Sequence, residues 1–141
     1  DLLESRGLGD VYKRQTMTSM TKHIAANVGD DAGSELVTVN WDINVSNPTE
    51  FLPLWTELSK STENYDWNAD ACGVQQHMLG NNGNGITHNV WCVFSSPQAA
   101  LNFLDNYTTT PEFAEYSAKV SDHRTFLRSH MAYLVKEYNP D

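Results

Sequence analysis

Apolar and polar residues alternate along residues 36–45, and this period of two is typical of a strand that buries one face. The apolar positions are Val37, Val39, Trp41, Ile43 and Val45, and the polar positions between them are Thr38, Asn40, Asp42 and Asn44. The same period recurs along residues 131–138. The pattern therefore predicts a first and a last strand, each with one apolar face.

Three segments carry apolar residues at helical spacing, and each begins with a capping residue followed by proline. These starts are Asn47-Pro48, Ser96-Pro97 and Thr110-Pro111. The predicted helices run to about residue 61, to about residue 107 and to about residue 120, and residues 122–128 are expected to continue the third.

Between the first two helices, two strand-like runs flank an Asn82-Gly83 turn, which predicts a hairpin of residues 71–80 and 85–95. A two-residue turn there sets His77 opposite His88, Gln76 opposite Asn89 and Val74 opposite Trp91. This register places Cys72 and Cys92 on opposite faces of the hairpin. Two free thiols and a reducing, cytoplasmic compartment are therefore expected.

The second and third helical segments follow one another and count as one helical unit. The predicted order is then strand, helix, strand, strand, helix, strand, which is the ferredoxin-like βαββαβ pattern of the α+β class. Its four antiparallel strands lie in the spatial order 4-1-3-2, with the helices on one face of the sheet. The helix-facing residues are expected to include Val39, Val74, Trp91 and Val93. The open face would then carry Val90, Phe94 and Leu134 among polar groups, a composition typical of an interface.

Composition limits the classes of partner. The chain has 141 residues, 40% of them hydrophobic, and no apolar run near the ~20 residues of a membrane-spanning helix. The formal charge of −9 disfavours nucleic acid and anionic membranes, because phosphate binding requires clustered Lys and Arg.

Residues 1–15 resemble translated sequencing-adaptor read-through, and residues 16–34 are polar and rich in glycine and aspartate toward their end. We expect residues 1–34 to be a non-native or mobile N-terminal segment. Residues 35–141 are expected to form a single domain.

The run 89–103 and the following Thr110-Pro111-Glu112-Phe113 resemble the strand-to-helix segment of the dimeric α+β barrel superfamily, which includes antibiotic biosynthesis monooxygenase-like domains. The resemblance implies a homodimer in which two sheets close into a barrel. Members include cofactor-independent oxygenases acting on polycyclic phenols, and haem-degrading enzymes that combine a strand Asn, a Trp and a helix His. Asn40 and Trp91 match the first two, but residues 97–107 contain no His, so no cofactor is expected.

The polar open face of the predicted sheet is the candidate site. His88, His77 and Asn40 are the candidate catalytic residues, because a His near neutral pKa can take a proton that an amide helps to position. The candidate substrate-binding residues are Asp42, Gln75, Asn44, His130 and Trp67.

Three roles remain open for the histidines. They form a structural cross-strand pair, or they act as general acid and base, or His77, His88 and Asp42 bind a metal ion, although no metal-binding spacing is present. The first function hypothesis is a small-molecule-binding protein, with monooxygenase or isomerase chemistry on a phenolic or enolisable substrate. The alternative is a non-catalytic module whose open face serves only dimerisation.

Overall fold

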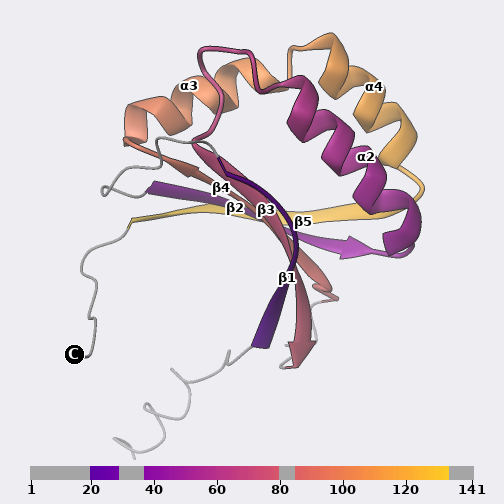
Figure 1. The fold of residues 1–141 in the computed structure, drawn as a ribbon. Coiled ribbons are helices and arrows are strands. Elements are labelled where there is room, and N and C mark those ends of the chain that lie inside the picture. The colour runs from indigo at the N-terminus through magenta and orange to yellow at the C-terminus, as the bar shows by residue number, and fades with distance from the viewer. Residues whose placement is uncertain (1–19, 29–36, 80–84, 134–141) are drawn as a thin grey trace, which may run out of the picture.

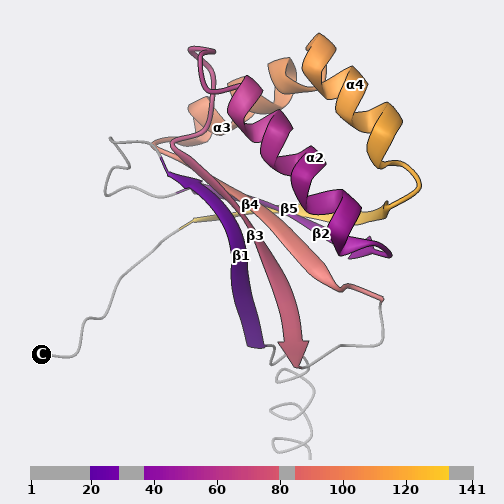
Figure 2. The ribbon, with the colours of Figure 1, turned by 45° about the vertical axis from the view of Figure 1, so that its right-hand side comes forward.

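The computed structural model describes residues 20–28, 37–79 and 85–133. The adaptor-like segment 1–15, the Asn82-Gly83 turn and positions 134–138 of the predicted last strand lie outside the described residues. The described part forms two layers, in which a twisted sheet is covered on one face by three helices (Figures 1 and 2).

The sheet has five strands, each antiparallel to its neighbours, in the order β1-β3-β4-β2-β5. The strands are β1 (Met20–Val28), β2 (Val37–Val45), β3 (Ala71–Leu79), β4 (His88–Phe94) and β5 (Arg124–Tyr133). Without β1, the order β5-β2-β4-β3 is the predicted ferredoxin-like order 4-1-3-2. The predicted α+β architecture with helices on one face is therefore confirmed.

Strand β1 corrects part of the expectation for the N-terminal segment. Residues 20–28 fall inside the stretch expected to be a mobile lead-in, but they pair with β3 and add a fifth strand at the edge of the sheet. The physical reason is that the outer edge of β3 offers unpaired N–H and C=O groups, which a nearby segment of weak amphipathic pattern can satisfy.

The three helices begin where their caps predict. They are α2 (Pro48–Ser61), α3 (Pro97–Tyr107) and α4 (Pro111–Val120). The side chains of Asn47, Ser96 and Thr110 each accept a hydrogen bond from the backbone N–H three residues later, at 3.4, 3.1 and 3.1 Å respectively. None of these helices is long and apolar enough to cross a membrane, among the residues that the structure describes.

The last strand starts seven residues earlier than predicted. Residues 124–128 belong to β5 and do not continue α4, because nine consecutive residues of β2 pair with this strand. A bulge between the Asp42 and Ile43 pairings leaves Leu127 without a cross-strand partner. This extra residue interrupts the alternation of apolar and polar residues along β5. Only the part of the strand after the bulge therefore shows a period of two.

The hairpin register differs by one residue from the prediction. Gln76 lies opposite His88, Gln75 opposite Asn89, Val74 opposite Val90 and Gly73 opposite Trp91. Cys72 consequently lies opposite Cys92, and the two form a disulfide. The expectation of two free thiols, on which the predicted reducing compartment depends, is therefore wrong.

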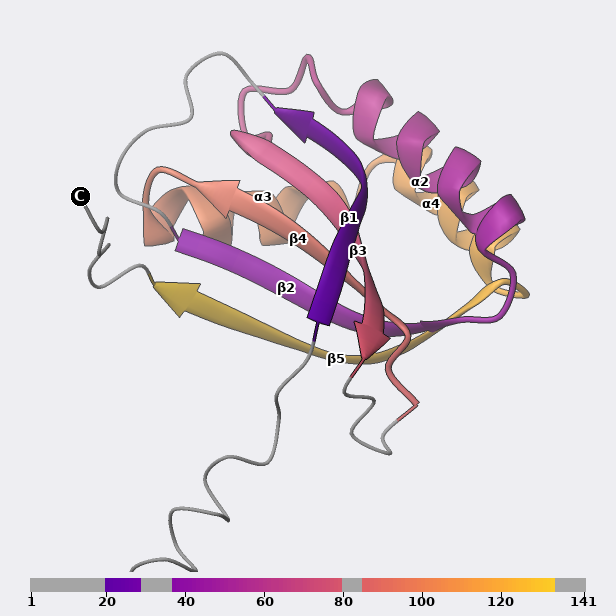
Figure 3. The same cartoon turned by 60° about the horizontal axis from the view of Figure 1, so that its bottom comes forward.

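A shift of one residue exchanges the two faces of a strand, so the predicted faces of β4 are also wrong. Cys92 and Phe94 are buried in a cluster under α3, and Val90 packs against the cluster under α2 and α4. Trp91 and Val93 lie on the face away from the helices, in register with Gly73 and Ala71. Figure 3 shows this uncovered face, with the strands in front of the helices.

Candidate functional site

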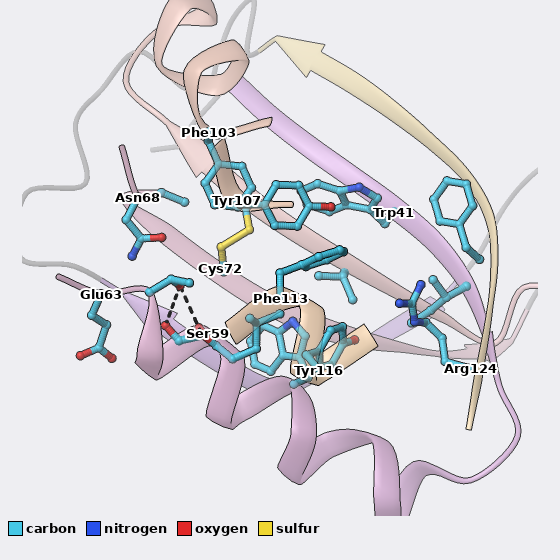
Figure 4. Close-up of a pocket in the computed structure, with 18 of the residues that line it drawn as sticks. Trp41, Ser59, Glu63, Asn68, Cys72, Phe103, Tyr107, Phe113, Tyr116 and Arg124 are labelled. Carbon is cyan, nitrogen blue, oxygen red and sulfur yellow. Dashed lines mark hydrogen bonds between the residues drawn. A yellow bond between two sulfur atoms is a disulfide. The ribbon is translucent and has the colours of Figure 1, made fainter. Parts of the chain in front are cut away.

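A cavity of about 660 Å³ lies between the sheet and the helices, a volume in the usual range for small-molecule sites. Strands β2, β3, β4 and β5 form its floor, the three helices form its walls, and the loop 62–70 closes one end (Figure 4).

Aromatic rings dominate the lining. They come from β2, all three helices and β5, and they are Trp41, Trp55, Phe103, Tyr107, Phe113, Tyr116 and Phe126. Tyr107 is the centre of a ring cluster. It stacks on Phe103 at a centroid distance of 4.7 Å and meets Phe113 and Trp41 edge-on at 4.9 and 6.1 Å. Such a lining suits a flat, mainly apolar molecule.

The floor of the cavity includes the Cys72–Cys92 disulfide and Val90. The disulfide joins the neighbouring strands β3 and β4 under Phe103 and Tyr107, as Figure 4 shows. It therefore fixes the spacing of β3 and β4 at the bottom of the site.

Arg124 supplies the one basic side chain among the described lining residues. Its guanidinium carbon lies 5.6 Å from the centroid of the Tyr116 ring, and its Nε is buried without a hydrogen-bond partner. Burial raises the pKa of Tyr116 to about 12, although the positive charge of Arg124 opposes this rise. Burial also raises the pKa of Tyr107, and the positive charge of Arg124 again opposes the rise. Both phenols are therefore neutral near pH 7 and can donate hydrogen bonds.

The opposite end of the cavity is acidic and polar. Glu63, Asn68 and Asp70 line it, and Figure 4 shows Glu63 and Asn68 at the far side from Arg124. The backbone N–H of Asp70 donates to the Val93 carbonyl at 2.9 Å, which fixes the start of β3. Asp70 lines the cavity, and its carboxylate oxygen Oδ2 is buried without a hydrogen-bond partner.

None of the site residues predicted from the sequence lines this cavity. Asp42 and Gln75 lie in one row across the open face, on either side of Asn89. Asp42 is 5% exposed, and its carboxylate accepts hydrogen bonds from Arg128 Nε and, at 3.1 Å, from Asn89 Nδ2. Its oxygens thus already have partners within the sheet.

Asn40 and His130 are the predicted residues that the structure does bring together. They are directly opposite on β2 and β5, one row from Asp42 on the open face. The amide of Asn40 donates to the Thr38 hydroxyl at 3.1 Å. Their roles in binding or catalysis stay a prediction.

His77 and His88 are not cross-strand partners, because Gln76 takes the position opposite His88. His88 is 2% exposed and faces the helix layer, where its ring centroid lies 6.4 Å from that of Phe51. Its Nδ1 lies 2.8 Å from the Thr87 hydroxyl oxygen. Burial lowers the pKa of His88, and the charge of His77 lowers it further.

The last two predicted residues have contacts in loops and at a strand end. The amide of Asn44 donates to the Gly85 carbonyl at 2.6 Å. Trp67 stacks on Tyr65 at 4.6 Å and meets the edge of Phe103 at 5.8 Å, just outside the cavity lining.

The predicted alternative metal site is not assembled. Asp42 and His88 are on opposite faces of the sheet, and among residues 20–28, 37–79 and 85–133 no three His, Cys, Asp or Glu side chains gather closely enough to hold an ion.

The lining aromatics of the three helices occur at the helical spacing that predicts a buried helix face, and Trp41 lies on the apolar side of the first predicted strand. Two features of the sequence pointed toward a cavity: the number of aromatic residues on the helices and strands that face one another, and the position of Arg124 two residues before Phe126. Neither signal distinguishes a filled core from a cavity before the register and the start of β5 are known.

No protein-family model matches the sequence, and no curated protein matches it. Solved structures do resemble it. A putative monooxygenase from Lactobacillus acidophilus NCFM has a TM-score of 0.50 and 12% identity, covering 84% of this chain and 50% of that one. A major regulator of staphylococcal pathogenesis has a TM-score of 0.49 and 12% identity, covering 84% and 69%. A putative monooxygenase from Fusobacterium nucleatum has a TM-score of 0.43 and 16% identity, covering 82% and 46%.

The chain thus spans half the length of the Lactobacillus protein. At this identity the likeness concerns the fold alone, an α+β arrangement similar to the monooxygenase-like, ferredoxin-like structures.

Proposed function

We propose that this protein binds a small, mainly aromatic organic molecule in the cavity between the sheet and the helices. The observation that carries the proposal is a cavity of about 660 Å³ whose lining is mostly aromatic and includes one cationic side chain, Arg124. Apolar cavities with a few polar groups are the usual form of a small-molecule site.

The test is a binding measurement with a neutral two-ring probe, biphenyl-4-methanol, by isothermal titration calorimetry. Val90→Phe places a ring in the cavity, whereas Val93→Phe makes the same change on the other face of the same strand. We expect Val90→Phe to raise the dissociation constant about tenfold or more, a loss of ~1.4 kcal/mol, and Val93→Phe to leave it unchanged.

Absence of binding to the wild-type protein, or equal binding by both variants, would contradict the proposal. A non-binding protein that is dimeric by light scattering would instead favour the assembly role. Melting curves of both variants check that each is folded.

A second candidate function is proton transfer on the bound molecule, and the position of the Asp70 carboxylate in the cavity lining favours it. In an isomerisation, the carboxylate would take a proton from an enolisable carbon and return it to another carbon, with no further reactant. Oxygenation of a phenol would need molecular oxygen as well, and the fold similarity to a putative monooxygenase gives that reaction only fold-level support.

Asp70→Asn separates binding from this chemistry, because the amide keeps the shape but cannot take the proton. If Asp70 is the base, the variant binds the probe normally and loses turnover of an enolisable aromatic ketone, measured by exchange of its α-hydrogens for deuterium. Equal exchange rates in the two proteins would exclude Asp70 as the base.

A further inference from the structure

Arg124 is a cation inside an aromatic cavity. It is the first residue of β5, pairs with Val45 at the end of β2, and contributes its side chain to the lining. Figure 4 shows the guanidinium at the end of the cavity remote from Glu63 and Asn68. Strand pairing thus fixes the backbone of Arg124, and its side chain places a positive charge in the cavity.

No carboxylate neutralises this charge within the described part of the chain. The two salt bridges there join Lys119 to Glu115 and Arg128 to Asp42. The Tyr116 ring next to Arg124 is a neutral group at pH 7. A guanidinium stays charged at all relevant pH values, and a partly buried charge is stabilised by an anionic partner.

The buried Nε of Arg124 has no hydrogen-bond partner. The two terminal nitrogens of a guanidinium also form a planar fork that binds both oxygens of a carboxylate. A carboxylate on the bound molecule would therefore balance the charge of Arg124 through these terminal donors.

The cavity is also long. Its lining includes Cys92, opposite Val39 on β2, and Arg124, opposite Val45 on the same strand. The six residue-to-residue steps from Val39 to Val45 correspond to about 20 Å of strand at ~3.3 Å per residue. Because the Arg124 side chain reaches back along the cavity, a rod-like molecule of two or more rings fits this length better than a single ring.

We propose that the natural occupant is an elongated aromatic carboxylic acid, with its carboxylate bound by the Arg124 guanidinium and its rings lying along Trp41 and Tyr107 toward the disulfide. This inference rests on the proposed function, since it names the ligand class of the same cavity.

The experiment compares two probes that differ in one group, biphenyl-4-carboxylate and biphenyl-4-methanol, with benzoate as the short acid. In the wild-type protein we expect the long acid to bind about tenfold more tightly than the alcohol, as a charge-assisted pair of hydrogen bonds contributes ~1.5 kcal/mol or more. Benzoate, whose single ring cannot extend from Arg124 to the disulfide, should bind more weakly than the long acid.

Arg124→Gln should lower the affinity for the acid and so remove its preference over the alcohol, and Arg124→Lys should restore part of that preference. Arg128→Gln is the matched control, because Arg128 lies on the same strand but bonds to Asp42 on the open face. It should keep the full preference.

Equal binding of acid and alcohol to the wild-type protein would overturn the inference, and so would a preference that survives in Arg124→Gln. In both cases alcohol binding leaves the proposed function intact. If neither long probe binds the wild-type protein, the proposed function fails and the inference fails with it. The wild-type comparison decides the matter even if Arg124→Gln does not fold.

Discussion

Gly73→Ala is the sharpest test of the strand register that brings the two cysteines together. Gly73 lies opposite Trp91 on the open face, and a Cβ atom at Gly73 would come within 3.0 Å of Cζ2, Cε2 and Nε1 of the Trp91 ring. Both residues belong to strands with a partner on each side, so neither backbone can move away freely. The indole ring or the strand spacing must therefore shift.

Two opposing effects set the magnitude. Alanine restricts the unfolded chain and on that account stabilises the protein by ~0.5–1 kcal/mol relative to glycine. The overlap with the ring costs ~1–3 kcal/mol, the usual range for overpacking. We expect a net loss of about 1–2 kcal/mol in the free energy of unfolding.

The assay is a double-mutant cycle by urea unfolding. In a Trp91→Leu background the overlap is relieved, so Gly73→Ala should be neutral or stabilising, and the coupling free energy should be about 2 kcal/mol. Gly85→Ala is the control: its φ of 72° makes alanine strained there, but its Cβ would lie 3.7 Å from Asn44 and away from Trp91. It should lower stability without coupling to Trp91→Leu.

Additive effects of Gly73→Ala and Trp91→Leu would refute this reasoning. The register predicted from an Asn-Gly turn places Val74, not Gly73, opposite Trp91 and would give that additive result. The cycle therefore discriminates between two registers that differ by a single residue.

Three further predictions concern the disulfide and two titrating groups. Replacing Cys72 and Cys92 by alanine should lower the free energy of unfolding by about 3 kcal/mol, because the bridge closes a loop with a sequence separation of 20, and reduction of the wild-type protein should have the same effect; free thiols by alkylation and mass spectrometry without reductant would contradict the pairing. The pKa of Tyr116 is raised to about 12, so its contribution to stability is complete below the unfolded pKa near 10 and is lost as the pH rises toward 12. Between these two pH values, the free energy of unfolding should depend less on pH in Tyr116→Phe than in the wild-type protein. The lowered pKa of His88 has the opposite sign, so that stability falls as the pH drops below ~6.5 and the buried imidazole must take a proton; His88→Gln should reduce this acid sensitivity, and an NMR titration of His88 near 6.5 would contradict it.

The helices and the strand order could be predicted because their signals are local. A capping side chain and a proline fix the first turn of each helix whatever surrounds it, and the structure has all three caps. The order of strands and helices then leaves few right-handed topologies, and the ferredoxin-like one is found.

The register of β3 and β4 could not be read from the turn residues. The pairing of Cys72 with Cys92 and of Gly73 with Trp91 depends on contacts between distant positions, and a one-residue offset reverses every face. The same limit applies to β5, where the bulge beside Asp42 conceals half of a strand.

The candidate site was predicted on the open face because polar residues gather there. Polar residues of a strand can also serve the sheet itself, as at Asp42, where both oxygens are bonded to neighbours in the sheet; a binding role for this face stays a prediction. Polar groups in a strand pattern indicate a face without helices, whereas a small-molecule cavity needs enclosed space.

The cavity itself follows from how rigid rings pack. Tyr107 contacts Phe103, Phe113 and Trp41, which come from α3, α4 and β2, so one cluster joins two helices to the sheet. Each such ring pair adds ~0.5–1.5 kcal/mol beyond its burial, and a flat ring cannot spread to fill the space beside it as an aliphatic chain does. Helical spacing records which side a residue faces, not how completely the space there is filled. The aromatic residues that periodicity assigns to a buried helix face thus also line the cavity.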